Sequence, residues 1–121
     1  MTRWLASAPL ILAIATCNNA MAPSQASRAT ITIRADGITP KEISINRGNR
    51  ITIVNLDSRP HRLMSDPHPD HSSCAALNFA TIAPGGQAQS PVLDDALDCS
   101  LHDEMNLGDA SFTTRVLVGV Q

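Results

Sequence analysis

Short stretches of alternating apolar and polar residues, separated by turn sequences, constrain the fold of this 121-residue chain more than any other feature. Alternation places every second side chain on the same face of a strand, so that one face can be buried. Strands are predicted over residues 30–34, 42–46, 51–54, 61–65, 87–93, 96–101 and 111–120. Turns are predicted at Gly37, Gly48 and Gly85. About seven short strands predict an all-β chain folded as a Greek-key β-sandwich.

The first 26 residues have the layout of a secretory signal peptide, with Arg3, an apolar run over 10–15 and then small and polar residues. The apolar run is too short to span a bilayer as a mature helix. Residues 14–17 are similar to a lipoprotein box, which makes Cys17 a candidate for lipidation; the alternative is a spare cysteine in a discarded signal. We therefore predict one exported, periplasmic domain over residues 27–121, attached to a membrane only if Cys17 is lipidated.

Composition argues against a nucleic-acid-binding protein. The formal net charge is −2, and the basic residues are scattered along the chain. The predicted domain has only Phe79 and Phe112 as aromatic residues, so it lacks the stacking platforms that bases require. We expect a monomer whose partner is a redox protein or a copper-handling protein.

Cys99, His102 and Met105 follow one another at C-x2-H-x2-M spacing, and His61 lies upstream. Two histidines and a cysteine in a plane, with a weak axial methionine, form the ligand set of a blue-copper centre. Soft sulfur stabilises the cuprous state, while imidazole serves both oxidation states. The motif therefore predicts a mononuclear copper site.

The sequence around these residues resembles the cupredoxin family. In residues 35–61 the pattern x-P-x-x-I-x-I-x-x-G begins at Thr39, and a strand, Asn55 and His61 follow it, as in that family. The segment from Cys99 to Met105 is similar to the amicyanin ligand loop, and the resemblance extends over about residues 30 to 121. It implies a sandwich with copper at one end that carries single electrons, with His102 as their exit route.

Residues 65–74 depart from amicyanin and plastocyanin. The sequence Ser-Asp-Pro-His-Pro at 65–69 resembles a bacterial cupredoxin-like branch, in which a blue-copper centre is not assured. His68 and His71 in this predicted loop are accessory metal-ligand candidates, the alternative being ordinary solvated imidazoles. Met64 and Glu104 are further candidates, with packing and solvation as their alternatives.

Cys99 has a second interpretation. Without the signal, the chain contains two cysteines, Cys74 and Cys99, and an even number in an exported protein favours a disulfide. With that bridge, copper could bind only through histidines, methionines or Glu104, which predicts a copper-handling or buffering module instead of an electron carrier. The two alternatives remain open at this point.

An enzymatic function is not expected. Cys99 and His102 could in principle form a nucleophile and its base, but no third, orienting residue and no oxyanion-hole motif can be recognised. Cysteine and histidine this close in sequence are more common in metal-binding loops.

Overall fold

The protein is described from a computed structural model in which Pro9, Ile11 and residues 29–120 are placed. The predicted signal peptide, Cys17 and the start of the domain at residue 27 lie outside these described residues. No helix in the described part of the chain is long and apolar enough to cross a membrane.

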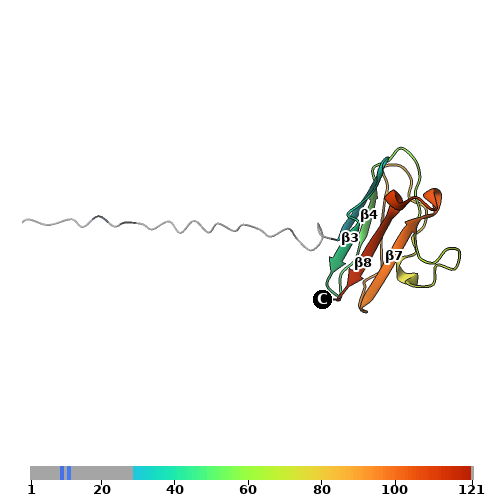
Figure 1. The fold of residues 1–121 in the computed structure, drawn as a ribbon. Helices are drawn as coiled ribbons and strands as arrows, with labels where there is room; N and C mark the ends of the chain where they lie inside the picture. The colour runs from blue at the N-terminus through green and yellow to red at the C-terminus, as the bar shows by residue number, and fades with distance from the viewer. Residues whose placement is uncertain (1–8, 10, 12–28, 121) are drawn as a thin grey trace, which may run out of the picture.

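Eight strands form two four-stranded sheets, which confirms the predicted all-β sandwich (Figure 1). The first sheet has the order β2-β1-β4-β6, and the second has the order β3-β8-β7-β5. The strands are β1 (Thr30–Arg34), β2 (Gly37–Thr39), β3 (Glu42–Ile45), β4 (Thr52–Asn55), β5 (Leu63–Ser65), β6 (Gln87–Gln89), β7 (Leu97–Asp103) and β8 (Thr113–Val118). Three single-turn 3₁₀ helices, η1 (Ala75–Leu77), η2 (Glu104–Asn106) and η3 (Ala110–Phe112), lie in the connections.

The two sheets bury the apolar side chains that alternation predicted to face inward. Ile31, Ile33 and Ile53 from the first sheet and Val116 and Val118 from the second have no exposed surface. These branched side chains suit a strand because they pack on a pleated, half-buried surface. The sandwich is therefore built from the same alternation that the sequence displays.

Several elements differ from the prediction. The strands expected over 61–65, 87–93 and 111–120 are shorter, as β5, β6 and β8. Residue Gly37, expected in a turn, begins the short strand β2, which pairs antiparallel with β1. Strand β7 extends two residues beyond the predicted end at Leu101, because His102 and Asp103 continue the pairing with β5 and β8. The residues expected to form a ligand loop thus begin inside a strand.

The loop between β5 and η1 lies beside β7 (Figure 1). Strand β5 is the last strand in the order of its sheet, so this loop passes an open edge. Asp66 N donates to the carbonyl of Ser100 at 2.9 Å, and Phe79 N donates to the carbonyl of Leu63 at 2.9 Å. These two bonds attach the start of the loop and the segment that follows η1 to the second sheet.

Candidate metal centre

The alternation of β7 separates the candidate ligands onto two faces of the second sheet. Cys99 and Leu101 belong to the buried core between the sheets, whereas His102 points to the outer face. Residues three apart in a strand always lie on opposite faces. The C-x2-H spacing therefore places Cys99 and His102 apart.

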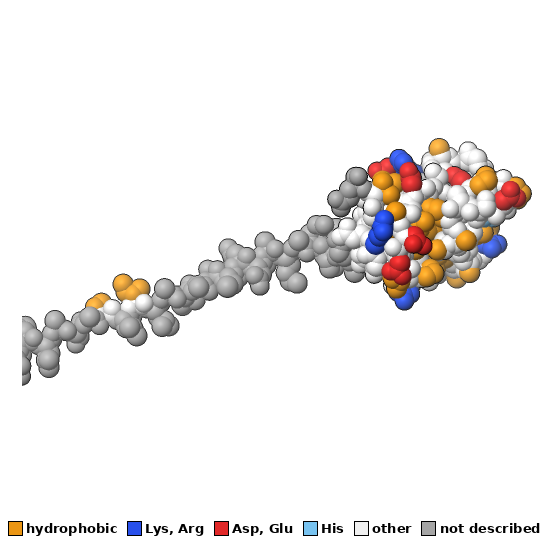
Figure 2. Space-filling view, turned by 90° about the horizontal axis from the view of Figure 1, so that it is seen from below, with side chains coloured by type: hydrophobic (Ala, Val, Ile, Leu, Met, Phe, Trp, Pro, Cys, Tyr) orange, Lys and Arg blue, Asp and Glu red, His pale blue; other side chains and the backbone are white. Residues whose placement is uncertain are grey.

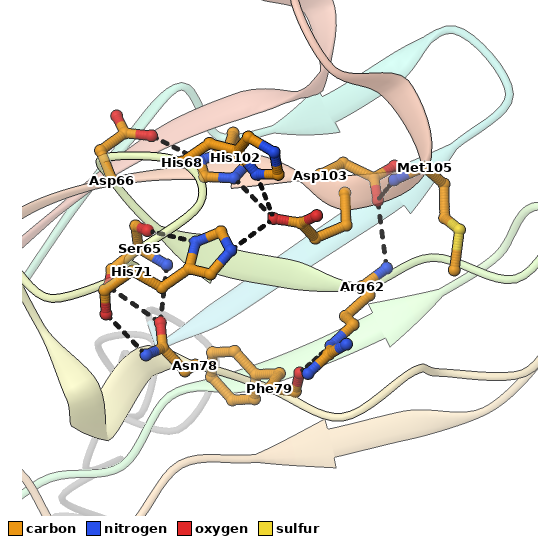
Figure 3. Close-up of polar contacts among 11 residues, drawn as sticks. Arg62, Ser65, Asp66, His68, His71, Asn78, Phe79, His102, Asp103 and Met105 are labelled. Atoms are coloured by element: carbon orange, nitrogen blue, oxygen red, sulfur yellow. Dashed lines mark hydrogen bonds and ion pairs between the residues drawn. The ribbon is translucent and has the colours of Figure 1, made fainter.

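On the outer face, three histidines converge on one carboxylate oxygen (Figure 3). Glu104 Oε1 lies 2.8 Å from His71 Nε2, 3.0 Å from His102 Nε2 and 3.2 Å from His68 Nδ1. One ligand atom from each of the four residues lies within 4.8 Å of all the others. Three imidazole nitrogens and a carboxylate oxygen at this spacing could hold one metal ion.

The outer ring nitrogens of two of these histidines have fixed partners. His71 Nδ1 donates to the carbonyl of Ser65 at 2.9 Å, and His102 Nδ1 donates to the Asp66 carboxylate. Each bond fixes the orientation of its ring and leaves Nε2 facing the centre of the cluster. Metal-binding histidines are normally held in this way by a carbonyl or carboxylate behind the ring.

A polar network also positions the backbone of His71. Its carbonyl accepts from Asn78 Nδ2 at 2.8 Å and from Ser65 Oγ at 3.0 Å, and Asn78 Oδ1 accepts from Ser65 N at 2.8 Å. His71 has a positive φ of 51°, a region that few non-glycine residues adopt. The network holds His71 in an otherwise unfavourable conformation, with its ring toward the cluster.

The charges in the cluster stabilise one another. Burial lowers the pKa of His102, but hydrogen bonds to Glu104 and Asp66 and their negative charge outweigh it, so the pKa of His102 is raised. Burial raises the pKa of Glu104, but hydrogen bonds from His102 and His68 and the nearby imidazoles lower it overall. The carboxylate is therefore kept ionised, as a metal ligand must be.

His61 lies between the sheets and not in this cluster. Its Nδ1 is 2.6 Å from Asp103 Oδ2, its Nε2 is 2.8 Å from Asp57 Oδ2, and its ring stacks on Phe112 with centroids 5.6 Å apart. Hydrogen bonding to His61 lowers the pKa of Asp57 against the effect of burial. Burial raises the pKa of Asp103, but hydrogen bonds from His61 and three further donors lower it overall.

The four residues of the predicted blue-copper set are not brought together. Cys99 forms a disulfide with Cys74, with Cα atoms 6.2 Å apart, so its sulfur is not a free thiolate. His61 is occupied at both nitrogens by carboxylates, and His102 joins the outer cluster. Met105 is 50% exposed, and Figure 3 shows its sulfur on the far side of Asp103 from the histidines.

Met105 instead borders a surface pocket of about 230 Å³ together with Arg59, Pro60, His61 and Asn106. His61 and Met105 of the predicted blue-copper ligands therefore line this pocket, whereas Cys99 and His102 do not. The disulfide also removes the thiol that a nucleophilic Cys99 would need. Of the two interpretations of Cys99, the structure has the disulfide.

The accessory candidates have different positions. His68, His71 and Glu104 all belong to the cluster, whereas Met64 is buried opposite His102 in the pairing of β5 with β7. The side chain of Asp103, the neighbour of Glu104, is fully buried. Alternation continued through Asp103 would have predicted this inward position.

Sequence comparison identifies no relatives: no protein-family model matches the chain, and no curated protein matches it. Solved structures do match. A purple cupredoxin from Nitrosopumilus maritimus is 19% identical over 74% of this chain and 98% of its own, with a TM-score of 0.60. Plastocyanin from Dryopteris crassirhizoma is 11% identical over 74% of this chain and 99% of its own, with a TM-score of 0.60.

An amicyanin mutant is 12% identical over 76% of this chain and 82% of its own, with a TM-score of 0.59. A copper-containing nitrite reductase from Thermus scotoductus matches 77% of this chain at 12% identity, but only 22% of its own chain. At these identities the similarity concerns the backbone arrangement. The chain has the cupredoxin fold.

Proposed function

We propose that this protein binds a divalent copper ion at the cluster of His68, His71, His102 and Glu104, as an exported copper-handling or buffering module. The observation that carries the proposal is the convergence of three imidazole nitrogens on Glu104 Oε1 at 2.8 to 3.2 Å. Side chains from β7, from η2 and from the loop between β5 and η1 meet at one point. Three segments of the chain therefore contribute ligands to a single site.

Copper fits this donor set. Imidazole binds copper in both oxidation states, and the hard, anionic carboxylate favours the cupric ion over the cuprous ion. Among divalent ions of the first transition series, Cu²⁺ has the highest intrinsic affinity for such ligands, with Zn²⁺ as the main competitor. Structural neighbours include a Cu(I) form of amicyanin and the copper-containing nitrite reductase, which supports the choice of copper.

A blue-copper electron carrier has less support. Such a centre needs a thiolate, and the Cys99 sulfur is bonded to Cys74. Both ring nitrogens of His61 face carboxylate oxygens, those of Asp103 and Asp57. The disulfide also favours an oxidising compartment, in agreement with export.

The test is a titration of the purified domain with Cu²⁺ and, separately, Zn²⁺ by calorimetry, with electron paramagnetic resonance of the copper form. We expect one ion per chain, ligation by nitrogen and oxygen, and no intense copper–thiolate absorption. His71→Gln and His102→Gln should each weaken binding at least about tenfold, since each removes a ligand. Asp70→Asn, in the same loop but outside the cluster, is the control.

Two results would contradict the proposal. Unchanged affinity in both histidine variants would place the ion elsewhere. An intense visible band that Cys99→Ser abolishes would instead establish a thiolate-bound copper and favour the electron carrier.

A further inference from the structure

The Cys74–Cys99 disulfide joins the two segments that carry the metal-ligand candidates. Cys74 follows His71 by three residues, and Cys99 precedes His102 by three residues. The bridge is thus the covalent connection nearest to the cluster between the loop and β7.

The bridge and the cluster lie on opposite sides of the second sheet. Cys99 has no exposed surface and Cys74 is 6% exposed, both within the core between the sheets. His71 and His102 meet on the outer face. Because β5 is the edge strand of the second sheet, the loop must pass around this edge to place His71 on the outer face and Cys74 in the core. The disulfide fixes the loop at Cys74.

Besides the disulfide, hydrogen bonds hold the loop in this path, with little regular secondary structure. Between β5 and β6 the only regular element among the described residues is the three-residue η1. Side-chain hydrogen bonds from Ser65 and Asn78 position His71, and Ser65 Oγ also accepts from Cys74 N at 3.3 Å. These contacts support the positive φ of His71.

We propose that the disulfide positions His68 and His71 for metal binding, so that its oxidation state regulates the affinity of the site. This inference rests on the proposed function. A dithiol reductant would transfer two electrons and two protons to the bridge, which breaks the sulfur–sulfur bond, forms two thiols and leaves the reductant as a disulfide. The freed loop then gains conformational entropy that metal binding must remove.

The effect is reciprocal, because metal affinity and disulfide stability are linked. An ion held by His71 and His102 keeps the loop closed over the buried sulfur atoms. The metal-bound protein therefore resists reduction.

The first test compares Zn²⁺ affinity, by calorimetry, in the oxidised protein and in the double variant Cys74→Ala/Cys99→Ala. Zinc does not oxidise thiols, and the variant has no thiol that could itself bind the ion. We expect binding about 10- to 100-fold weaker in the variant, the usual range when support behind the ligands is lost. Ile43→Ala, which destabilises the core from β3, a strand that β8 separates from β7, should bind zinc as the wild type does.

The second test uses the unaltered protein, so it decides the matter if the double variant fails to fold. A water-soluble phosphine reduces the disulfide, taking oxygen from water to become the phosphine oxide while two thiols form. Thiol labelling followed by mass measurement gives the rate. We expect saturating Zn²⁺ to slow the reduction at least about tenfold, in proportion to its occupancy.

The inference is overturned if the folded double variant binds zinc within about twofold of the wild type, or if zinc leaves the reduction rate unchanged. These failures would leave the proposed function intact, because the wild type would still bind the ion. Absence of binding to the oxidised wild type would refute the proposed function, and the inference with it.

Discussion

His61 is held between two buried carboxylates, those of Asp57 and Asp103. Its ring joins the two carboxylates, with Nε2 2.8 Å from Asp57 Oδ2 and Nδ1 2.6 Å from Asp103 Oδ2. His61 therefore acts as a structural group in this protein.

Replacing His61 tests this role. His61→Leu keeps the approximate volume but leaves Asp103 with only its donors from Arg62, Met105 and Asn106. Removing one hydrogen-bond partner from a buried carboxylate destabilises the fold, and with the remaining bonds we expect a loss of about 2 kcal/mol of unfolding free energy. Urea denaturation measures it. His68→Leu, at a half-exposed ring, is the matched control and should change stability little.

Glu104 supplies the only anionic ligand of the candidate centre. Glu104→Gln retains the size and one oxygen but removes the charge, so Cu²⁺ and Zn²⁺ should bind at least about tenfold more weakly in calorimetry. Glu42→Gln, at an exposed carboxylate on β3, should leave the affinity unchanged. Equal affinities in the two variants would exclude Glu104 from the site.

At the scale of elements, β7 decides which residues meet. Its end depends on pairing of Leu63 with Asp103 and of His102 with Thr113, contacts between segments far apart in sequence. Local alternation predicted the strands and their buried faces, but could not show that pairing continues through His102. In the structure β7 continues through His102, which places Cys99 and His102 on opposite faces of the sheet.

The loop shows the same limit. The sequence indicated a loop with two histidines, but it did not decide whether Cys74 forms a disulfide with Cys99. That His68 and His71 reach Glu104 depends on the disulfide, on Ser65 and on Asn78, which act together only in the folded chain. Residue types could be recognised in advance, whereas their convergence could not.

Strand β2 depends on a glycine at its first residue. Gly37 has a φ of +141°, and a Cβ there would lie 2.4 Å from the carbonyl oxygen of Ser111. Gly37→Ala should therefore lower the unfolding free energy by more than about 1 kcal/mol. The alanine would have to adopt a strained φ, and the backbone near Ser111 would have to move away from the new methyl group. Gly48→Ala, with φ +84° but open space around the new methyl group, should cost less in the same denaturation assay.

Over the whole molecule, charged groups of both signs are interspersed on the face shown in Figure 2. No single-sign patch is visible on this face. The acidic residues with structural roles are the buried ones around His61. They link the stability of the entire domain to pH.

The free energy of unfolding of the metal-free protein should fall as the pH falls from about 5 downward. The pKa values of Asp57 and Asp103 are lowered in the folded state, so their contribution is present above the ordinary value near 3.8 and disappears as the pH passes through the lowered values. In urea denaturation at a series of pH values, Asp103→Asn should make the free energy of unfolding depend less steeply on pH in this acidic range. Asp36→Asn, at an exposed turn, should leave this pH dependence as steep as in the wild type.

Metal binding should stabilise the whole domain, because the cluster exists only when the loop, β7 and η2 are all in place. An ion at 100 times its dissociation constant adds about 2.7 kcal/mol, which for a domain of this size raises the melting temperature by roughly 10 °C. Calorimetric melting with and without Zn²⁺ measures the shift, and a chelator should reverse it. The shift should fall to about half in His102→Gln if binding is tenfold weaker, and further if it is weaker still, and should persist in Asp70→Asn. A shift of equal size in both variants would mean that the stabilising ion binds outside the cluster.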